Sequence, residues 1–259
     1  MKRMNLKNSV IILTGASSGI GRFLLMKLLD EGATVVAVSR HMTKDSIEHE
    51  RLVKLDKDLS NQAAIDDVFK QTMAQFKTID AFIANAGYAY YRKESNPDWE
   101  SAKAIVNTNM MSVLYSAQKL KALKGDEPFN FMVTLSAVSY LSMPGYALYG
   151  MTKMGLRGFI ESWRMELNKG QIAQAVYPVA TKTAFFNRAE QSRKPWPVQE
   201  ADHVAKVMLK GLKKDRRQIF PSKLFKFGFK LFPWGFKPYI AQERKAFLKM
   251  IDVRSYKGE

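Results

Sequence analysis

The sequence predicts an α/β protein built on a doubly wound parallel sheet of about seven strands, with helices on both faces. Two observations lead to this prediction. Short runs rich in β-branched residues alternate with longer runs that repeat Leu and Met at helical spacing through the first two-thirds of the chain. The short runs are apolar at successive positions, as expected for parallel strands that helices cover on both faces. Right-handed crossovers between such strands give the doubly wound arrangement.

The expected elements follow one another in a regular order. Strands are expected at residues 10–13, 34–38, 52–55, 79–84, 129–135, 172–177 and 217–220, and helices at residues 22–31, 61–76, 100–124 and 149–168. Gly32 follows the first helix, where glycine commonly ends a helix. Ser60 is expected to cap the amino end of the second helix. Because no repeat and no long linker divides the sequence, residues 1–259 are expected to form one domain.

The composition excludes several classes of site. The 259 residues include no cysteine, which excludes a disulfide framework, cysteine-ligated zinc or iron–sulfur sites and a thiol nucleophile, and no metal site is expected. Residues 1–9 do not form a secretory signal, and no apolar run approaches the roughly 18 residues of a membrane-spanning helix. We therefore expect a cytoplasmic protein that is not integral to a membrane.

The chain is strongly basic. Its net charge is +17 and its isoelectric point is about 9.9. An excess of this size attracts polyanions. Nucleic acid, an anionic membrane surface and an acidic substrate carrier are the three candidate partners, and a solvated basic surface without any partner explains the charge equally well.

A glycine-rich turn connects the first expected strand to the first helix. It reads Thr14-Gly15-Ala16-Ser17-Ser18-Gly19-Ile20-Gly21, with the spacing G-x-x-x-G-x-G. Glycine lets the backbone turn tightly and lets a pyrophosphate approach the amides, and the positive end of the following helix faces the phosphates. The turn therefore predicts a Rossmann-like dinucleotide site, with contacts from Gly15, Ser17, Ser18, Gly19, Ile20 and Gly21.

The end of the second strand indicates which dinucleotide is bound. Folds of this kind that prefer NAD carry an acidic residue there for the ribose 2′-hydroxyl. This chain has Ser39 and Arg40 instead, so no carboxylate repels a 2′-phosphate and a guanidinium is available to bind one. Arg22, just after the glycines, is a second candidate. We expect the cofactor to be NADP(H).

Further motifs follow along the chain. They are Asp58-Leu59-Ser60 after the third strand, Asn85-Ala86-Gly87 after the fourth, Asn109 in the long helix, Ser136 after the fifth strand, Tyr149 with Lys153, and Pro178 with Thr183. In this order the chain resembles a short-chain dehydrogenase/reductase from about residue 7 to residue 220. The resemblance implies an adenine contact by Asp58 and Leu59. It also implies cofactor contacts by Asn85, Ala86, Gly87, Tyr149, Lys153, Pro178 and Thr183.

Carbonyl reduction by a nicotinamide needs a proton from the protein, and the resemblance assigns that proton to Tyr149. A tyrosine hydroxyl has an ordinary pKa of about 10, and a fixed cation nearby stabilises the phenolate. Tyr149 and Lys153 lie four residues apart, which places them on one face of a helix.

Two more residues complete the catalytic set that the resemblance implies. Ser136 would orient the substrate carbonyl beside Tyr149, with Ser139 and Ser142 as nearby alternatives. Asn109 would hold a water that joins Lys153 to a proton relay, and Asn107 is the alternative for that role.

Two positions depart from the family pattern. Val179 follows Pro178 where the family usually has glycine, and Ser112 replaces a frequent glycine after Asn109. Neither departure removes a reacting group. Both bear on the shape of the loop beside the cofactor.

Large apolar side chains gather in the segments where the family builds its substrate pocket. They are Tyr88, Tyr90, Tyr91, Tyr140, Met143, Tyr146, Phe185 and Phe186. A lining of this kind suits a bulky apolar substrate. Some of these side chains are expected to pack in the core or at a subunit contact instead.

The carboxyl-terminal part of the chain mixes lysines with aromatic residues. Residues 219–239 contain four lysines, eight aromatic residues and no acidic residue. Such a segment suits a membrane surface, a lid over an apolar pocket or a subunit contact. We expect residues 190–259 to form a substrate lid and this basic aromatic segment.

These observations lead to one prediction of function and one alternative. The chain is predicted to be an NADP(H)-dependent oxidoreductase that interconverts a carbonyl and a secondary alcohol on a hydrophobic or acyl-type substrate. The resemblance also implies a homodimer or homotetramer through the helices at residues 100–124 and 149–168. Nucleic acid is not expected as a partner. The alternative is a non-catalytic NADP(H)-binding sensor or scaffold, because related folds can keep the cofactor site and lose the chemistry.

Overall fold

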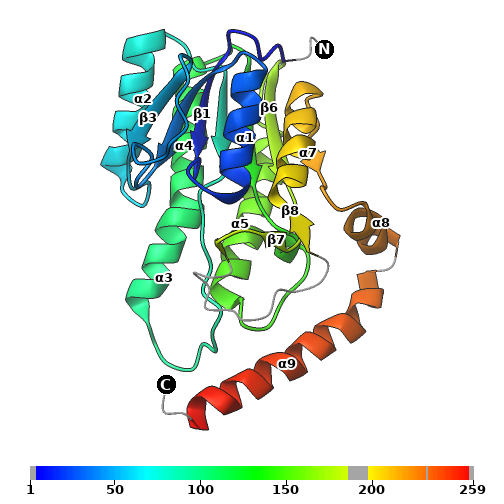
Figure 1. Cartoon of the computed structure of the whole chain (residues 1–259). Coiled ribbons are helices and arrows are strands. Elements are labelled where there is room, and N and C mark those ends of the chain that lie inside the picture. The colour runs from blue at the N-terminus through cyan, green and yellow to red at the C-terminus, as the bar shows by residue number, and fades with distance from the viewer. Residues whose placement is uncertain (1–3, 186–197, 232, 257–259) are drawn as a thin grey trace.

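The computed structural model describes residues 4–185, 198–231 and 233–256 (Figure 1). Seven parallel strands form the central sheet, in the order β3-β2-β1-β4-β5-β6-β9. Their bounds are β1 Val10–Thr14, β2 Thr34–Ser39, β3 Leu52–Asp56, β4 Ala81–Ala84, β5 Phe129–Thr134, β6 Gln171–Val176 and β9 Gln218–Ile219. The doubly wound sheet that the sequence predicts is confirmed, and each strand lies within the residues expected for it or within one residue of them.

Helices cover both faces of this sheet because successive strand residues point to opposite sides. On β1, Ile11 and Leu13 pack beneath α1 (Gly19–Asp30) and α7 (Ala201–Lys213). Ile12 points the other way, into the core formed with α2 (Gln62–Phe76), α4 (Ser112–Lys124) and α5 (Ala147–Trp163). The two cores hold the strands in place, so that the carboxyl ends of all seven meet at one edge of the sheet.

Three local details differ from the expectations. Asn61, not Ser60, caps α2, since its side chain accepts a hydrogen bond from the Ala63 amide at 2.9 Å. The helix that starts near Tyr149 begins two residues earlier and ends at Trp163. The sequence did not predict α7, which covers one sheet face with Val204, Ala205, Met208 and Leu212.

The long helix expected over residues 100–124 is interrupted. It consists of α3 (Trp99–Val106), a π-helical turn (Asn107–Met111) and α4. A π-helical turn holds one residue more than an α-helical turn, and such turns recur at functional sites. The interruption lies where the sequence placed Asn109.

The carboxyl-terminal helices lie outside the sheet and its two helical layers. Two short strands, β7 (Thr181–Lys182) and β8 (Gln199–Glu200), pair in parallel ahead of α7. After β9 come α8 (Lys223–Leu231), a 3₁₀ turn (Pro233–Phe236) and α9 (Lys237–Tyr256). In Figure 1, α9 runs obliquely across the lower part of the molecule, below the loops that precede α3 and α5. Its Phe247 ring meets the Tyr91 ring there, with 5.4 Å between centroids.

Candidate active site

A cavity of about 990 Å³ lies at the carboxyl edge of the sheet. Its wall is formed by the glycine-rich turn, by residues that follow β2, β3, β4, β5 and β6, by α5 and by α8 with the turn after it. All but two of the predicted cofactor and catalytic residues line it: Gly15, Ser17, Ser18, Gly19, Ile20, Ser39, Arg40, Asp58, Leu59, Asn85, Ala86, Gly87, Ser136, Tyr149, Lys153, Pro178 and Thr183. Gly21 and Asn109 do not. The volume is at the upper end of the range usual for ligand pockets, about 300–1,000 Å³.

The glycine-rich turn has no room for side chains at its first and last glycine. Gly15 adopts φ +65°, and a Cβ there would lie 2.8 Å from the Ala86 Cα. A Cβ on Gly21 would lie 2.0 Å from the Gly15 carbonyl oxygen, so Gly21 serves the packing of the turn behind the cavity wall. The amino end of α1 faces the cavity with its backbone amides. This cradle fits a bound pyrophosphate.

The turn after β4 is tied directly to β1. The Thr14 hydroxyl oxygen accepts hydrogen bonds from the amides of Asn85 at 2.9 Å and Ala86 at 3.0 Å. The Asn85 side chain donates to the Gly15 carbonyl oxygen and accepts from the Thr134 hydroxyl. The cavity wall therefore joins three neighbouring strands through hydrogen bonds of buried or half-buried groups.

At the end of β2 the cavity is polar and cationic. Arg40 is exposed, lines the cavity and has no salt bridge to any described carboxylate. The Ser39 hydroxyl is buried and has no hydrogen-bond partner among the described residues. His41 and Lys57 line the same region, which the sequence did not predict, and Lys57 pairs with Asp67 at 2.6 Å. An unsatisfied hydroxyl beside a guanidinium fits a phosphate group.

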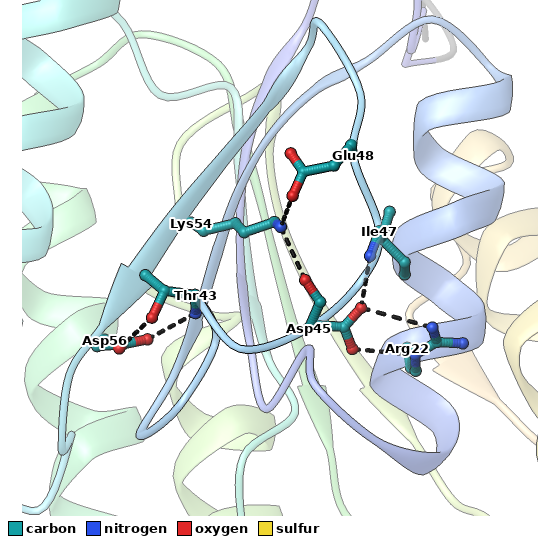
Figure 2. A network of polar contacts seen from close by, with 7 residues as sticks. All are labelled: Arg22, Thr43, Asp45, Ile47, Glu48, Lys54 and Asp56. Carbon is teal, nitrogen blue, oxygen red and sulfur yellow. Dashed lines mark hydrogen bonds and ion pairs between the residues drawn. The ribbon is translucent and has the colours of Figure 1, made fainter.

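Arg22, the second candidate for the 2′-phosphate, does not line the cavity. Figure 2 shows its guanidinium directed at Asp45, and the ion pair is 3.0 Å long. Burial raises the pKa of Asp45, but hydrogen bonds from Arg22 and the Ile47 amide outweigh this effect and hold that pKa below its usual range. Arg22 thus fixes the loop that follows Arg40.

Tyr149, Ser136 and Lys153 lie together in the cavity wall. Burial raises the pKa of Tyr149 to about 12, although a hydrogen bond with the Ser136 side chain acts in the opposite direction. Lys153 is buried, which lowers its pKa to about 8. Its Nζ donates to the Thr134 carbonyl oxygen at 2.8 Å and lies 5.7 Å from the centre of the Tyr149 ring. Ser139 and Ser142 do not line the cavity.

Asn109 lies directly behind this group. It is fully buried in the π-helical turn, and its side chain exchanges hydrogen bonds with the Tyr88 amide at 3.0 Å and the Tyr88 carbonyl at 2.8 Å. A Cβ on Gly87 would lie 3.1 Å from the Asn109 Oδ1 and 3.7 Å from the Lys153 Nζ. The structure thus brings Asn109, not the half-buried Asn107, next to Lys153.

The two departures from the family pattern have different places. Val179 lines the cavity beside Pro178, whose carbonyl oxygen accepts from the Ala137 amide at 2.8 Å. Ser112 is buried in α4, and its hydroxyl donates to the carbonyl oxygen of Thr108, a residue of the cavity wall, at 2.6 Å. Of the two departures, only Val179 lines the cavity itself.

The remainder of the wall is apolar. Of the predicted aromatic set, Tyr88, Tyr90, Met143, Tyr146 and Phe185 line the cavity, whereas Phe186 lies outside the described residues. Tyr91 packs behind Tyr146, and Tyr140 stacks against Tyr177 and Phe220 in the core. Leu224, Phe225, Phe236 and Tyr239, from the segment expected to form a lid, also line the cavity, as do Val138 and Leu141, which the sequence did not predict. Among the described residues, no cluster of three or more His, Asp or Glu side chains could hold a metal ion.

The fold and this cavity define a dinucleotide-binding oxidoreductase. The family model described as short chain dehydrogenase matches residues 9–194, and the chain belongs to that family. Relatives support this membership. A (2S)-[(R)-hydroxy(phenyl)methyl]succinyl-CoA dehydrogenase subunit of Thauera aromatica is 25% identical over 225 residues, covering 80% of this chain and 90% of the relative. A 3-dehydrosphinganine reductase of Danio rerio is 24% identical over 232 residues, covering 81% and 70%.

Solved structures have the same fold. A short chain dehydrogenase from Burkholderia cenocepacia, in complex with NADP, has a TM-score of 0.78 and 20% identity, and the match covers 92% of this chain and 99% of the other. Another solved member of the family holds NAD. Structures of this fold therefore hold either dinucleotide.

Proposed function

We propose that this oxidoreductase uses NADP(H) to interconvert a carbonyl and a secondary alcohol. The observation that carries the proposal is the group formed by the Tyr149 hydroxyl, the Ser136 hydroxyl and the Lys153 ammonium. These three groups line one cavity together with the glycine-rich turn. A substrate carbonyl between the two hydroxyls would accept a hydrogen bond from each of them.

In the proposed reaction, Tyr149 transfers the proton, and Lys153 and Ser136 stabilise its phenolate. The bound cofactor supplies or accepts the hydride. Tyr149 gives its proton to the substrate oxygen during reduction and takes it back during oxidation. Because burial raises the pKa of Tyr149 to about 12, the phenolate needs stabilisation, which a protonated Lys153 and the Ser136 hydrogen bond provide. Asn109 fixes the Tyr88 backbone beside Lys153, where a relay water would bind.

The choice of NADP(H) rests on the end of β2. Arg40 and the unsatisfied Ser39 hydroxyl offer a cation and a hydrogen-bond donor to a 2′-phosphate. Asp56, the acidic residue at the end of the neighbouring β3, accepts hydrogen bonds from the Thr43 amide and hydroxyl (Figure 2). Asp45 pairs with Arg22. Both carboxylates are thus engaged by other groups.

We propose a hydrophobic or acyl-type substrate, because the wall around Tyr149 is mostly aromatic and aliphatic. The Thauera relative is named for a substituted succinyl-CoA and the Danio relative for 3-dehydrosphinganine, which agrees with such a substrate. We also propose that the carboxyl-terminal helices form a lid over the cavity. The chain is proposed to form a homodimer or homotetramer through the helices at residues 99–124 and α5. Finally, it is proposed to make peripheral contact with an anionic membrane.

The test is turnover of NADPH with a panel of carbonyl compounds that includes long-chain 3-oxoacyl thioesters and keto lipids. Tyr149→Phe removes the proton donor and leaves the ring, so the rate is expected to fall by about 10²–10⁴-fold. Undiminished turnover by Tyr149→Phe would overturn the mechanism. Tight NADPH binding without turnover of any carbonyl would favour the sensor instead.

A further inference from the structure

Helix α8 presents an apolar and cationic surface to solvent. Leu224 and Phe227 are 60% and 56% exposed and lie three residues apart, on one side of the helix. Lys223 is exposed beside them, and the Lys226 Nζ lies 5.5 Å from the centre of the Phe227 ring. Neighbouring exposed apolar side chains rimmed by charged residues are a common feature of surfaces that bind a membrane or another molecule.

The adjoining side of α8 forms part of the cavity. Phe225 is 4% exposed and lines the cavity together with Gly228, and Phe236 and Tyr239 continue this lining beyond the helix. Leu224 belongs to both surfaces, because it lines the cavity and is exposed to solvent. It therefore lies at the cavity rim. The same cavity extends from Leu224 at this rim to Tyr149, and apolar side chains such as Phe225 and Phe185 line it as well.

The chain from β9 through most of α9 is strongly basic. Residues 219–250 include seven Lys and Arg and a single acidic residue, Glu243. Glu243 is buried, whereas Lys223, Lys237 and Lys245 are exposed. None of these three lysines has a salt bridge to a described carboxylate. Cations beside exposed Leu and Phe side chains match the interface of an anionic bilayer, where phosphates lie above acyl chains.

We propose that α8 docks on an anionic lipid bilayer and that the cavity takes its substrate, a lipid with an acyl chain and a keto or hydroxyl group, directly from that bilayer at the Leu224 rim. This proposal rests on the proposed function for the nature of the substrate. The docking itself does not depend on the chemistry. Within the described residues no helix is long and apolar enough to cross a membrane, so the contact is with the bilayer surface.

An acidic carrier protein or a second copy of the chain would use the surface differently. A protein partner needs shape complementarity over roughly 800 Å² of each surface. The exposed features of α8 are two apolar side chains with lysines around them, which a fluid bilayer accommodates without a matching shape. If the wild-type chain binds an acidic carrier protein but does not bind anionic vesicles, the docking proposal is wrong and the surface belongs to the carrier.

The experiment is cosedimentation of the full chain with vesicles of phosphatidylcholine that contain about one-third phosphatidylglycerol, and with vesicles of phosphatidylcholine alone. The wild-type chain is expected to bind the anionic vesicles at low salt and to lose affinity as salt rises. Lys223→Gln with Lys226→Gln is expected to bind about 30-fold more weakly, from the usual effect of two lysines at an anionic surface. Leu224→Ser with Phe227→Ser is expected to bind at least about tenfold more weakly.

Matched controls separate this surface from net charge and general hydrophobicity. Lys7→Gln with Lys169→Gln removes the same charge at exposed positions that precede β1 and β6, at the opposite edge of the sheet. Phe23→Ser with Met26→Ser removes an aromatic and an aliphatic side chain three residues apart on α1, where they are 42% and 43% exposed. Both controls are expected to bind vesicles within about twofold of the wild type.

Fluorescence titration with NADPH is performed on every variant, because it reports the cofactor site and the fold independently of lipid. Failure of the wild type to bind anionic vesicles, or equal losses in the α8 variants and the controls, overturns the docking proposal and leaves the proposed function untouched. Vesicle binding by α8 with no reduction of any carbonyl overturns the proposed function and leaves the docking intact.

Discussion

The Lys153 ammonium donates a hydrogen bond to the Thr134 carbonyl oxygen at 2.8 Å. This contact anchors the cation at the end of β5, two residues before Ser136, and keeps it beside the Tyr149 ring. The cation and the two hydroxyls are therefore positioned by one strand end and one helix. Five predictions follow from this arrangement and from the residues around it.

The first prediction concerns pH. Lys153 has its pKa lowered to about 8 by burial, whereas the Tyr149 pKa is raised to about 12. Of these two groups, Tyr149 stays protonated between about pH 6 and pH 10, whereas Lys153 loses its charge. The kcat/KM for carbonyl reduction is therefore expected to be highest below about pH 8 and to fall above it. Steady-state kinetics across this range measure the profile, and a kcat/KM that rises through pH 8 would contradict it.

The second prediction identifies the group that titrates. Lys153→Met keeps a side chain of similar length without a charge, so the inflection near pH 8 is expected to disappear. The rate at neutral pH is expected to fall by about 10²-fold or more, because the phenolate loses its cation. The Tm of the variant serves as the control for folding. An unchanged inflection in this variant would assign the titration to another group.

The third prediction compares two arginines. Arg40→Ala is expected to erode the preference for NADPH over NADH by about tenfold, the loss of one charge-assisted contact with the 2′-phosphate. Arg22→Ala is the matched control, since Arg22 pairs with Asp45 and does not line the cavity. It is expected to change the ratio of the two dissociation constants by less than about twofold and stability by about 0–1 kcal/mol. Fluorescence titration with both cofactors gives the ratios, and a preference for NADH in the wild type would remove the role of Arg40.

The fourth prediction concerns the glycine-rich turn. Gly21→Ala would place a Cβ 2.0 Å from the Gly15 carbonyl oxygen and 2.6 Å from the Asn85 Nδ2, so the turn must shift. NADPH affinity is expected to fall by at least about tenfold, with a lower Tm. Gly158→Ala in α5 is the control, because its Cβ meets open space, and it is expected to raise stability by about 0.5–1 kcal/mol. Equal behaviour of the two variants would argue against a close-packed turn.

The fifth prediction tests whether α9 acts as a lid. Phe247 is 7% exposed and packs on Tyr91, beside the aromatic group that contains Tyr146 and Tyr149. Phe247→Ala is expected to lower stability by about 3 kcal/mol and to raise KM for an apolar substrate. Leu248→Ala, at a neighbouring position 39% exposed, is expected to change stability by less than about 0.5 kcal/mol. Similar Tm and KM values for both variants would show that α9 does not close the cavity.

Much of the fold was predictable because local patterns determine it. The apolar runs predicted all seven strands of the sheet, and parallel strands bring their carboxyl ends to one edge. Residues as distant in sequence as Ser39, Asn85 and Ser136 therefore line one cavity. The pairing of Tyr149 with Lys153 follows from helical periodicity alone. Asn109 was separable from Asn107 only by family resemblance, since the π-helical turn has no clear local signal.

Contacts between distant segments were not predictable. Tyr90 and Tyr91 are adjacent, yet Tyr90 lines the cavity and Tyr91 packs against Phe247 of α9. Nothing in the local sequence says which of two neighbouring aromatic side chains faces a cavity. A lid was expected over residues 190–259, but which of its side chains line the cavity depends on how a helix near residue 225 packs against loops more than 70 residues earlier. The capping of α2 by Asn61 instead of Ser60 is a choice between two adjacent residues that both favour this position.

The π-helical turn at residues 107–111 also sets the phase between two hydrophobic clusters. Ile105, before the turn, packs with Tyr146 and Phe247, whereas Val113, after it, packs against the sheet. Each residue of an α-helix rotates the next by about 100°. Deleting one residue from the turn would restore regular helix and would rotate Ile105 away from α9 while Val113 kept its place. The one additional residue in the π-helical turn therefore lets Ile105 face the cluster with Phe247 of α9 while Val113 faces the core of the sheet.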